Sequence, residues 1–182
     1  NLAGNEDVFA GATISGVGTI DLTAGTAGTI AGGNWSADKV DLGFDNAGNA
    51  ITLADASTIE VTSDQAGMDI NYAAGSAGNL TLVAGDDNGA SAAVGTITLG
   101  ALNLATGTAT SAGTVTIEAS TANVTATSTV LDAAQSLVIT GDEDVNLGQV
   151  TAASLTANES SGIITATSTT SATTMTTGGG AW

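Results

Sequence analysis

The chain of 182 residues contains no cysteine, histidine or proline, and Lys39 is its only lysine or arginine. Without Cys and His, disulfide frameworks and the usual zinc sites are excluded. Catalysis by a Ser-His-Asp or Cys-His arrangement is excluded as well, because the histidine base is missing. Binding to nucleic acid requires several cationic side chains at the phosphates, whereas the formal net charge here is −17. Nucleic acid is therefore not an expected partner.

Aromatic residues make up only 3% of the chain, although hydrophobic residues make up 42%. The apolar material is mainly Ile, Val, Leu and Ala, set among many Thr, Ser and Gly residues. This bias toward β-branched residues favours strands over helices. No apolar run approaches the length of a transmembrane helix, so we expect a protein that does not span the membrane.

Short alternating units of the form apolar-x-apolar recur along the chain, with mostly Thr, Asp, Asn or Glu between the apolar residues. A period of two is typical of strands with one face buried, and turns with Gly, Asn and Asp separate the units. The best candidate for a helix is 128–136. The units are Ile20–Leu22, Val40–Leu42, Ile51–Leu53, Ile59–Val61, Met68–Ile70, Leu80–Leu82, Ile97–Leu99, Leu102–Leu104, Val115–Ile117, Leu137–Ile139 and Val145–Leu147.

Two all-β folds can accommodate such units. A β-sandwich needs large side chains to fill an interior about 10 Å thick, whereas a parallel β-solenoid (β-helix) of short strands has a narrow interior that small and branched residues fill. The similarity of 76–82 to 111–117 and of 17–22 to 94–99 indicates a degenerate repeat. We therefore predict a solenoid with roughly 20 residues per coil and about 4.8 Å between strands, and keep the sandwich as the alternative.

The predicted organisation has three parts. Residues 1–15 form an N-terminal segment or cap, residues 16–168 the β-solenoid repeat region, and residues 169–182 a low-complexity end rich in Thr and Gly.

Three segments carry a resemblance to known proteins: GNLTLVAGDD (78–87), AGTVTIEAS (112–120) and residues 136–168. They are similar to the repetitive β-strand regions of large secreted bacterial surface proteins, the filamentous-haemagglutinin-like adhesins and S-layer-type proteins. The resemblance implies a right-handed β-helix, an extracellular location at the cell surface or in the matrix, and an adhesive or scaffolding role.

Carboxylates are the only abundant chemical groups, and two clusters are candidate calcium sites. Calcium takes six to eight oxygen ligands from carboxylates, carbonyls and water. The alternative is that both clusters are solvated acidic turns. The candidate ligands are Asp86, Asp87 and Asn88 in one turn, and Asp142, Glu143 and Asp144 in the other.

Paired carboxylates can also hydrolyse glycosides, but the clefts that do so usually offer aromatic platforms, and this chain has five aromatic residues. We therefore expect no catalytic residue and no enzyme. The expected function is that of a non-catalytic structural segment of a secreted adhesin, filament or S-layer protein, a stiff acidic scaffold that self-assembles. The alternative is a β-helix module that depends on divalent cations or binds carbohydrate. The expected partners are the chain itself, in a homo-oligomer, fibre or layer, neighbouring repeats of a longer chain, and cell-surface polysaccharide.

Overall fold

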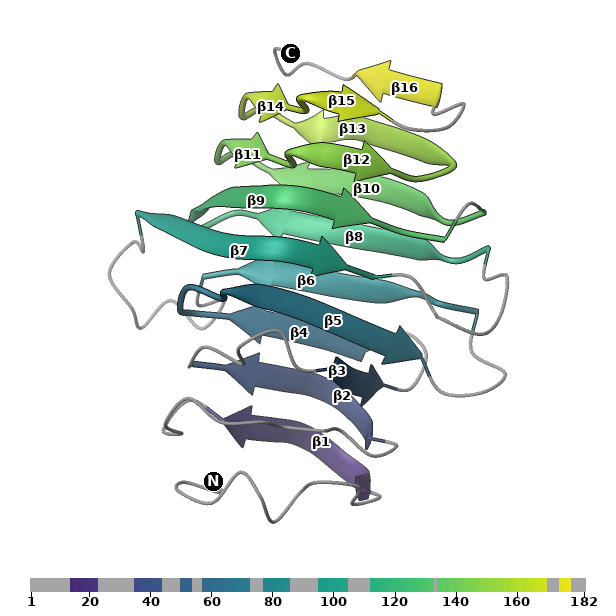
Figure 1. The fold of residues 1–182 in the computed structure, drawn as a ribbon. Coiled ribbons are helices and arrows are strands. Elements are labelled where there is room, and N and C mark those ends of the chain that lie inside the picture. Colours follow the sequence, from purple (N-terminus) through teal and green to yellow (C-terminus); the bar gives the residue numbers. More distant parts are fainter. Residues whose placement is uncertain are drawn as a thin grey trace.

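A computed structural model describes residues 14–22, 35–43, 50–53, 57–72, 77–85, 95–104, 112–132, 134–169 and 174–177. These residues form a parallel β-solenoid without any helix (Figure 1). None of them therefore lies in a helix that could cross a membrane. The strands are β1 (Ile14–Leu22), β2 (Trp35–Leu42), β3 (Ala50–Leu53), β4 (Ser57–Val61), β5 (Gly67–Tyr72), β6 (Leu80–Ala84), β7 (Thr96–Asn103), β8 (Thr114–Ala119), β9 (Asn123–Val130), β10 (Ser136–Gly141), β11 (Val145–Asn146), β12 (Gln149–Thr151), β13 (Ser154–Ser160), β14 (Ile164–Thr165), β15 (Ser168–Thr169) and β16 (Thr174–Thr177).

The strands stack in two parallel ladders. Ladder A runs β1-β2-β4-β6-β8-β10-β13-β16, and ladder B runs β3-β5-β7-β9 and then through β11 and β12 to β14 and β15. Strand β2 belongs to both ladders, because Trp35 pairs with Leu53 of β3 while the end of β2 pairs with β4. Every pairing among the described strands is parallel, so the prediction of a solenoid is confirmed and the sandwich alternative is wrong. Strands β1 and β16 lie at opposite ends of the stack (Figure 1).

The length of a coil follows from the residues that pair along ladder A. Consecutive partners lie 18 to 23 residues apart at every step but one, close to the predicted repeat. At the exception the partners lie 35 residues apart, and that step includes 86–94 and 105–111, which are outside the described residues. The steps are Ile20 to Val40, Val40 to Ile59, Ile59 to Leu82, Leu82 to Ile117 (the long one), Ile117 to Ile139, Leu137 to Leu155, and Leu155 to Met175.

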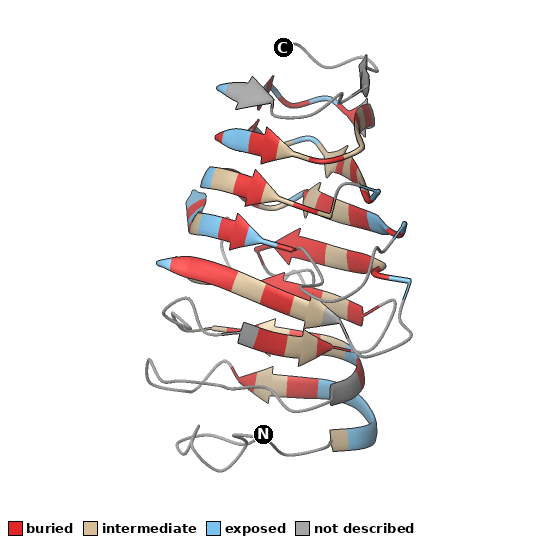
Figure 2. Ribbon diagram, turned by 45° about the vertical axis from the view of Figure 1, so that its right-hand side comes forward, coloured by how far each residue is buried: buried red, intermediate tan, exposed pale blue. Residues whose placement is uncertain are grey.

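The interior of the solenoid is a stack of aliphatic side chains. Both apolar residues of every alternating unit predicted from the sequence are buried, and red and tan alternate along the strands in Figure 2. Because the pairing is in register, an inward residue rests on an inward residue of the next coil. Burying one such side chain stabilises the fold by about 1.5–3 kcal/mol. One continuous stack contains Ile20, Val40, Ile59, Leu82, Ile117 and Ile139.

Glycine and glutamine fix two of the corners between the ladders. Gly141 has φ +97°, and a Cβ atom there would lie 2.2 Å from the carbonyl oxygen of Ala119 in the preceding coil, so only glycine fits. The side chain of Gln135 is fully buried; its Oε1 accepts from the amide of Asp132 at 2.9 Å, and its Nε2 donates to the carbonyl of Gly78 at 2.9 Å. A buried amide that is satisfied in this way holds the turn without strain.

The candidate helix at 128–136 was wrong. Its first part is the end of β9, and its last residue begins β10. Thr129 points inward there and donates its hydroxyl to the carbonyl of Leu147 at 3.0 Å, so the tertiary stack overrides a weak local helical preference.

The described ladder continues beyond the predicted boundaries of the repeat region. Strand β1 starts at Ile14, inside the segment 1–15, and β16 lies inside 169–182 and pairs with β13.

The aliphatic stack predicts the effect of a matched pair of substitutions in β8. Ile117→Ala leaves a cavity in the middle of the stack and should lower the free energy of unfolding by about 2–5 kcal/mol. Thr116→Ala changes the neighbouring side chain on the outer face and should change it by less than about 1 kcal/mol. Urea unfolding followed by circular dichroism measures both. Equal effects would contradict the buried stack.

Candidate functional site

Parallel pairing also aligns the outward side chains of ladder A in two columns. We name them by their commonest residues. The threonine column contains Thr19, Lys39, Thr58, Thr81, Thr116, Val138 and Thr156, and the acidic column contains Asp21, Asp41, Glu60, Val83, Glu118 and Thr140.

Lys39 lies between two carboxylates of the acidic column. Its Nζ is 2.5 Å from Oε2 of Glu60 in the next coil and 3.3 Å from Oδ1 of Asp41 on its own strand. The three side chains are 19%, 5% and 15% exposed for Lys39, Glu60 and Asp41 respectively. Like charges opposite each other on neighbouring strands are destabilising. The only cationic side chain of the molecule thus neutralises the place where stacked carboxylates are least hydrated.

A second recurring arrangement occurs where strands begin. There an Asn or Asp side chain accepts a hydrogen bond from a backbone amide one coil further on, so that the ladder continues around the corner. The acceptor–donor pairs are Asp64 Oδ1 with the Thr98 amide (2.8 Å), Asn79 Oδ1 with the Thr114 amide (2.9 Å), Asn123 Oδ1 with the Asp144 amide (2.9 Å) and Asp144 Oδ1 with the Ile163 amide (2.8 Å).

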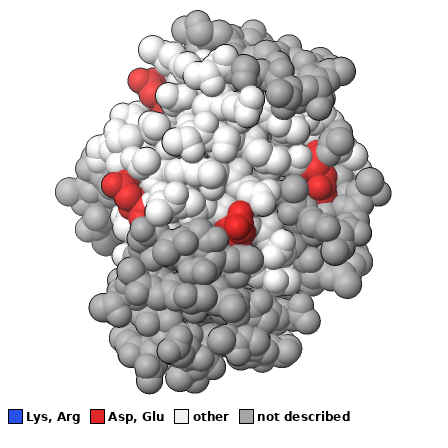
Figure 3. Space-filling view, in the orientation of Figure 1, with Lys and Arg blue, Asp and Glu red and all other residues white. Residues whose placement is uncertain are grey.

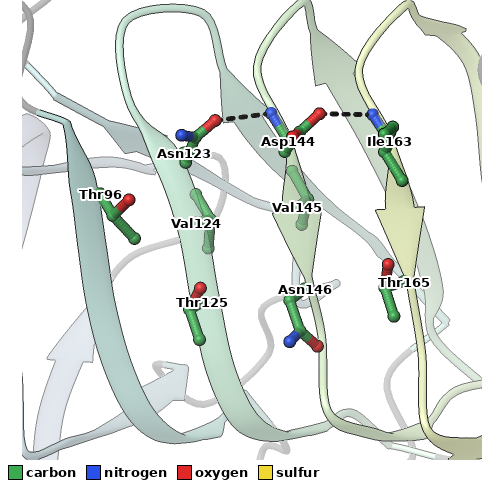
Figure 4. A pocket seen from close by; sticks show the side chains of 9 residues that line it. All are labelled: Thr96, Asn123, Val124, Thr125, Asp144, Val145, Asn146, Ile163 and Thr165. Carbon is green, nitrogen blue, oxygen red and sulfur yellow. Dashed lines mark hydrogen bonds between the residues drawn. The ribbon is translucent and has the colours of Figure 1, made fainter.

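Two of these side-chain acceptors, Asn123 and Asp144, line a shallow groove on the outer face of ladder B (Figure 4). The groove has a volume of about 220 Å³ and extends over β7, β9, β11 and β14. Its polar groups are hydroxyls, amides and one carboxylate, which are suited to hydrogen bonds with a polar, uncharged ligand. The lining residues are Thr96, Asn123, Val124, Thr125, Asp144, Val145, Asn146, Ile163 and Thr165.

Of the two predicted calcium clusters, one is described. Asp142, Glu143 and Asp144 follow β10, with Asp142 and Asp144 exposed, and one oxygen of Asp144 accepts from the Ile163 amide. Within the described part of the chain, no three acidic, His or Cys side chains are grouped to hold a metal ion. The acidic side chains visible in Figure 3 are likewise scattered over that face. Asp86, Asp87 and Asn88 lie outside the described residues. Calcium binding at either cluster stays a prediction.

The contact between Lys39 and Glu60 was missed in the sequence, although the sequence contains its signal. The alternation around Val40 and Ile59 places residues 39, 41, 58 and 60 on the outer face. A coil of roughly 20 residues then brings 41 beside 60. The groove was not predicted, because its lining comes from β7, β9, β11 and β14, and the sequence did not show that these strands are neighbours.

A comparison of the chain with protein-family models, with curated proteins and with solved structures finds no match in any of the three. Inference about function therefore starts from the two ladders, the groove and the ion cluster.

Two variants separate the contribution of the hydrogen bond from the Ile163 amide to Asp144 from the effect of charge on the free energy of unfolding. Asp144→Ala removes the bond and one negative charge, whereas Asp142→Ala removes a charge from the same exposed turn. Relieving repulsion in an acidic chain stabilises both variants alike, so the free energies of unfolding should differ by about 1 kcal/mol, with Asp144→Ala the less stable. Chemical denaturation of the two variants side by side measures this difference. Identical stabilities would show that the bond contributes nothing.

Proposed function

We propose that this chain is a non-catalytic structural segment, a stiff acidic scaffold of a secreted bacterial adhesin, filament or S-layer protein. The observation that carries the proposal is the continuous parallel ladder from β1 to β16, in which only the β1–β2 and β10–β13 pairings contain a register shift. A force along or across this stack is shared by rows of backbone hydrogen bonds and by an interior filled with aliphatic side chains. In this proposal, the stacked ladder as a whole carries out the function, and no single site is required.

The outer surface supports the same function. Threonines and carboxylates face outward in columns, and a high net charge of one sign keeps a long chain soluble and apart from like surfaces. Among the described strands, β1 pairs only with β2 and β16 only with β13, so the opposite edge of each could accept a further strand. Self-assembly, or continuation into neighbouring repeats of a longer chain, would use these ends. The resemblance of 78–87, 112–120 and 136–168 to surface-protein repeats supports the extracellular location.

Single-molecule force spectroscopy tests the scaffold. If the coils open one after another, as nearest-neighbour repeat structures do, extension should proceed in increments of about 6–8 nm for steps of 18–23 residues and about 12 nm for the 35-residue step. Ile117→Ala should lower the force needed for the increments on either side of β8. Thr116→Ala should leave these forces unchanged. Smooth extension at low force would contradict a mechanical role.

The groove on ladder B favours carbohydrate binding as a second candidate function. Carbohydrates are recognised through many hydroxyl groups, and here hydroxyls of Thr96, Thr125 and Thr165 lie beside the amide groups of Asn123 and Asn146 (Figure 4). Because the chain is strongly acidic, the ligand would be a neutral or amino-bearing polysaccharide and not a uronic acid polymer.

Binding to a glycan array of neutral, amino and acidic polysaccharides tests this candidate. The double variant Thr125→Val/Thr165→Val keeps the β-branched shape of both side chains but removes two hydroxyls from the groove lining, so binding should fall at least tenfold. The matched control Thr81→Val changes a threonine on ladder A and should bind like the unchanged protein. Equal binding by both variants, or no binding by the unchanged protein, would reject the groove as a carbohydrate site.

A further inference from the structure

The ion cluster of Lys39, Asp41 and Glu60 brings together the three groups needed to form an amide bond between side chains. Lys39 supplies the amine, Glu60 a carboxyl group at 2.5 Å, and Asp41 a second carboxyl group 3.3 Å from the same Nζ atom. The amine and the nearer carboxyl lie on different coils, because Lys39 is in β2 and Glu60 in β4. A bond between them would therefore cross-link two rungs of ladder A.

The surroundings hold these groups in place and limit the access of water. Glu60 lies between two inward residues of β4, and its backbone is paired with Asp41 on one side and Val83 on the other. Glu60 and Val83 are 3% and 6% exposed although both belong to the outer columns. Effective concentrations of well-oriented groups reach about 10⁵–10⁸ M, and a site poor in water favours loss of water from the pair.

We propose that Lys39 and Glu60 form an intramolecular isopeptide bond, with Asp41 as the proton relay. The ammonium group of Lys39 passes a proton to Asp41, and the neutral Nζ attacks Cδ of Glu60. The C–N bond forms as one C–O bond of the carboxyl group breaks. Asp41 returns its proton, so that two protons of the ammonium leave with that oxygen as one molecule of water. An ammonium and a carboxylate are thus converted into a neutral amide, and no oxidant or other reactant is needed.

Such a bond closes the chain between residues 39 and 60 into a covalent loop. In a chain without cysteine, it would be a cross-link that resists both reduction and mechanical unfolding. The inference does not depend on the proposed scaffold function, since the bond can form in a protein of any role.

The sequence makes the test unusually clear, because Lys39 is the only site at which trypsin can cleave. Trypsin does not recognise a lysine whose Nζ is acylated. The purified chain should therefore be lighter than its sequence by the mass of one water molecule. After full denaturation, it should resist trypsin, and fragmentation by another protease should yield a branched peptide joining Lys39 to Glu60.

Three variants complete the experiment. Glu60→Ala should show the full mass and, once denatured, be cut into fragments 1–39 and 40–182. Asp41→Ala should keep the circular dichroism spectrum of the fold, but most molecules should have the full mass, because the bond has not formed. A purely structural role of Asp41 would not cause this result. Asp38→Asn, which removes an exposed carboxylate beside Lys39, should be cross-linked like the unchanged chain. Full mass and complete cleavage of the unchanged chain at Lys39 would overturn the proposal, as would a cross-link to any residue other than Glu60.

Discussion

Parallel pairing in register is the constraint on which the rest of this structure depends. Each residue lies beside the residue about one coil further along the chain, so similar side chains at equivalent positions of successive coils form a column. Inward positions such as Ile59 and Leu82 give an unbroken aliphatic stack, and outward positions such as Thr58 and Thr81 give a row of hydroxyls. The large aromatic residues that are typical of ordinary cores are not needed here, because branched aliphatic residues fill so thin an interior.

Pairing in register also places like charges next to one another on neighbouring coils. Asp21, Asp41 and Glu60 are consecutive members of the acidic column, and carboxylates at neighbouring rungs repel one another more strongly as water is withdrawn. Further along, Val83 interrupts the column before Glu118. The only cationic side chain of the protein lies at the buried part of the acidic run. This placement offsets the repulsion between Asp41 and Glu60, and it also creates the cluster for which we propose the isopeptide bond.

The sequence predicted burial better than it predicted neighbours. Alternation is local, and both apolar residues of a unit such as Val115–Ile117 are buried as expected, because a one-residue shift would expose them. Which rungs meet depends on loop lengths: the similarity of 76–82 to 111–117 contains the 35-residue step between Leu82 and Ile117, but a predicted coil of roughly 20 residues did not identify these two segments as neighbours. Asp144 makes a contact that the sequence did not predict: at its corner, one oxygen of this predicted calcium ligand accepts a hydrogen bond from the Ile163 amide.

A filled solenoid leaves its outer surface as the place where chemistry can occur. The interior of the described coils is packed with side chains, so a ligand would have to lie on the outer surface, where neighbouring members of a column are about 4.8 Å apart. In the groove of ladder B, Thr125, Asn146 and Thr165 follow one another in register on successive coils. Extended polymers with a repeated unit satisfy such a surface better than compact small molecules do. Parallel pairing therefore shapes the outer surface of the solenoid as well as its interior.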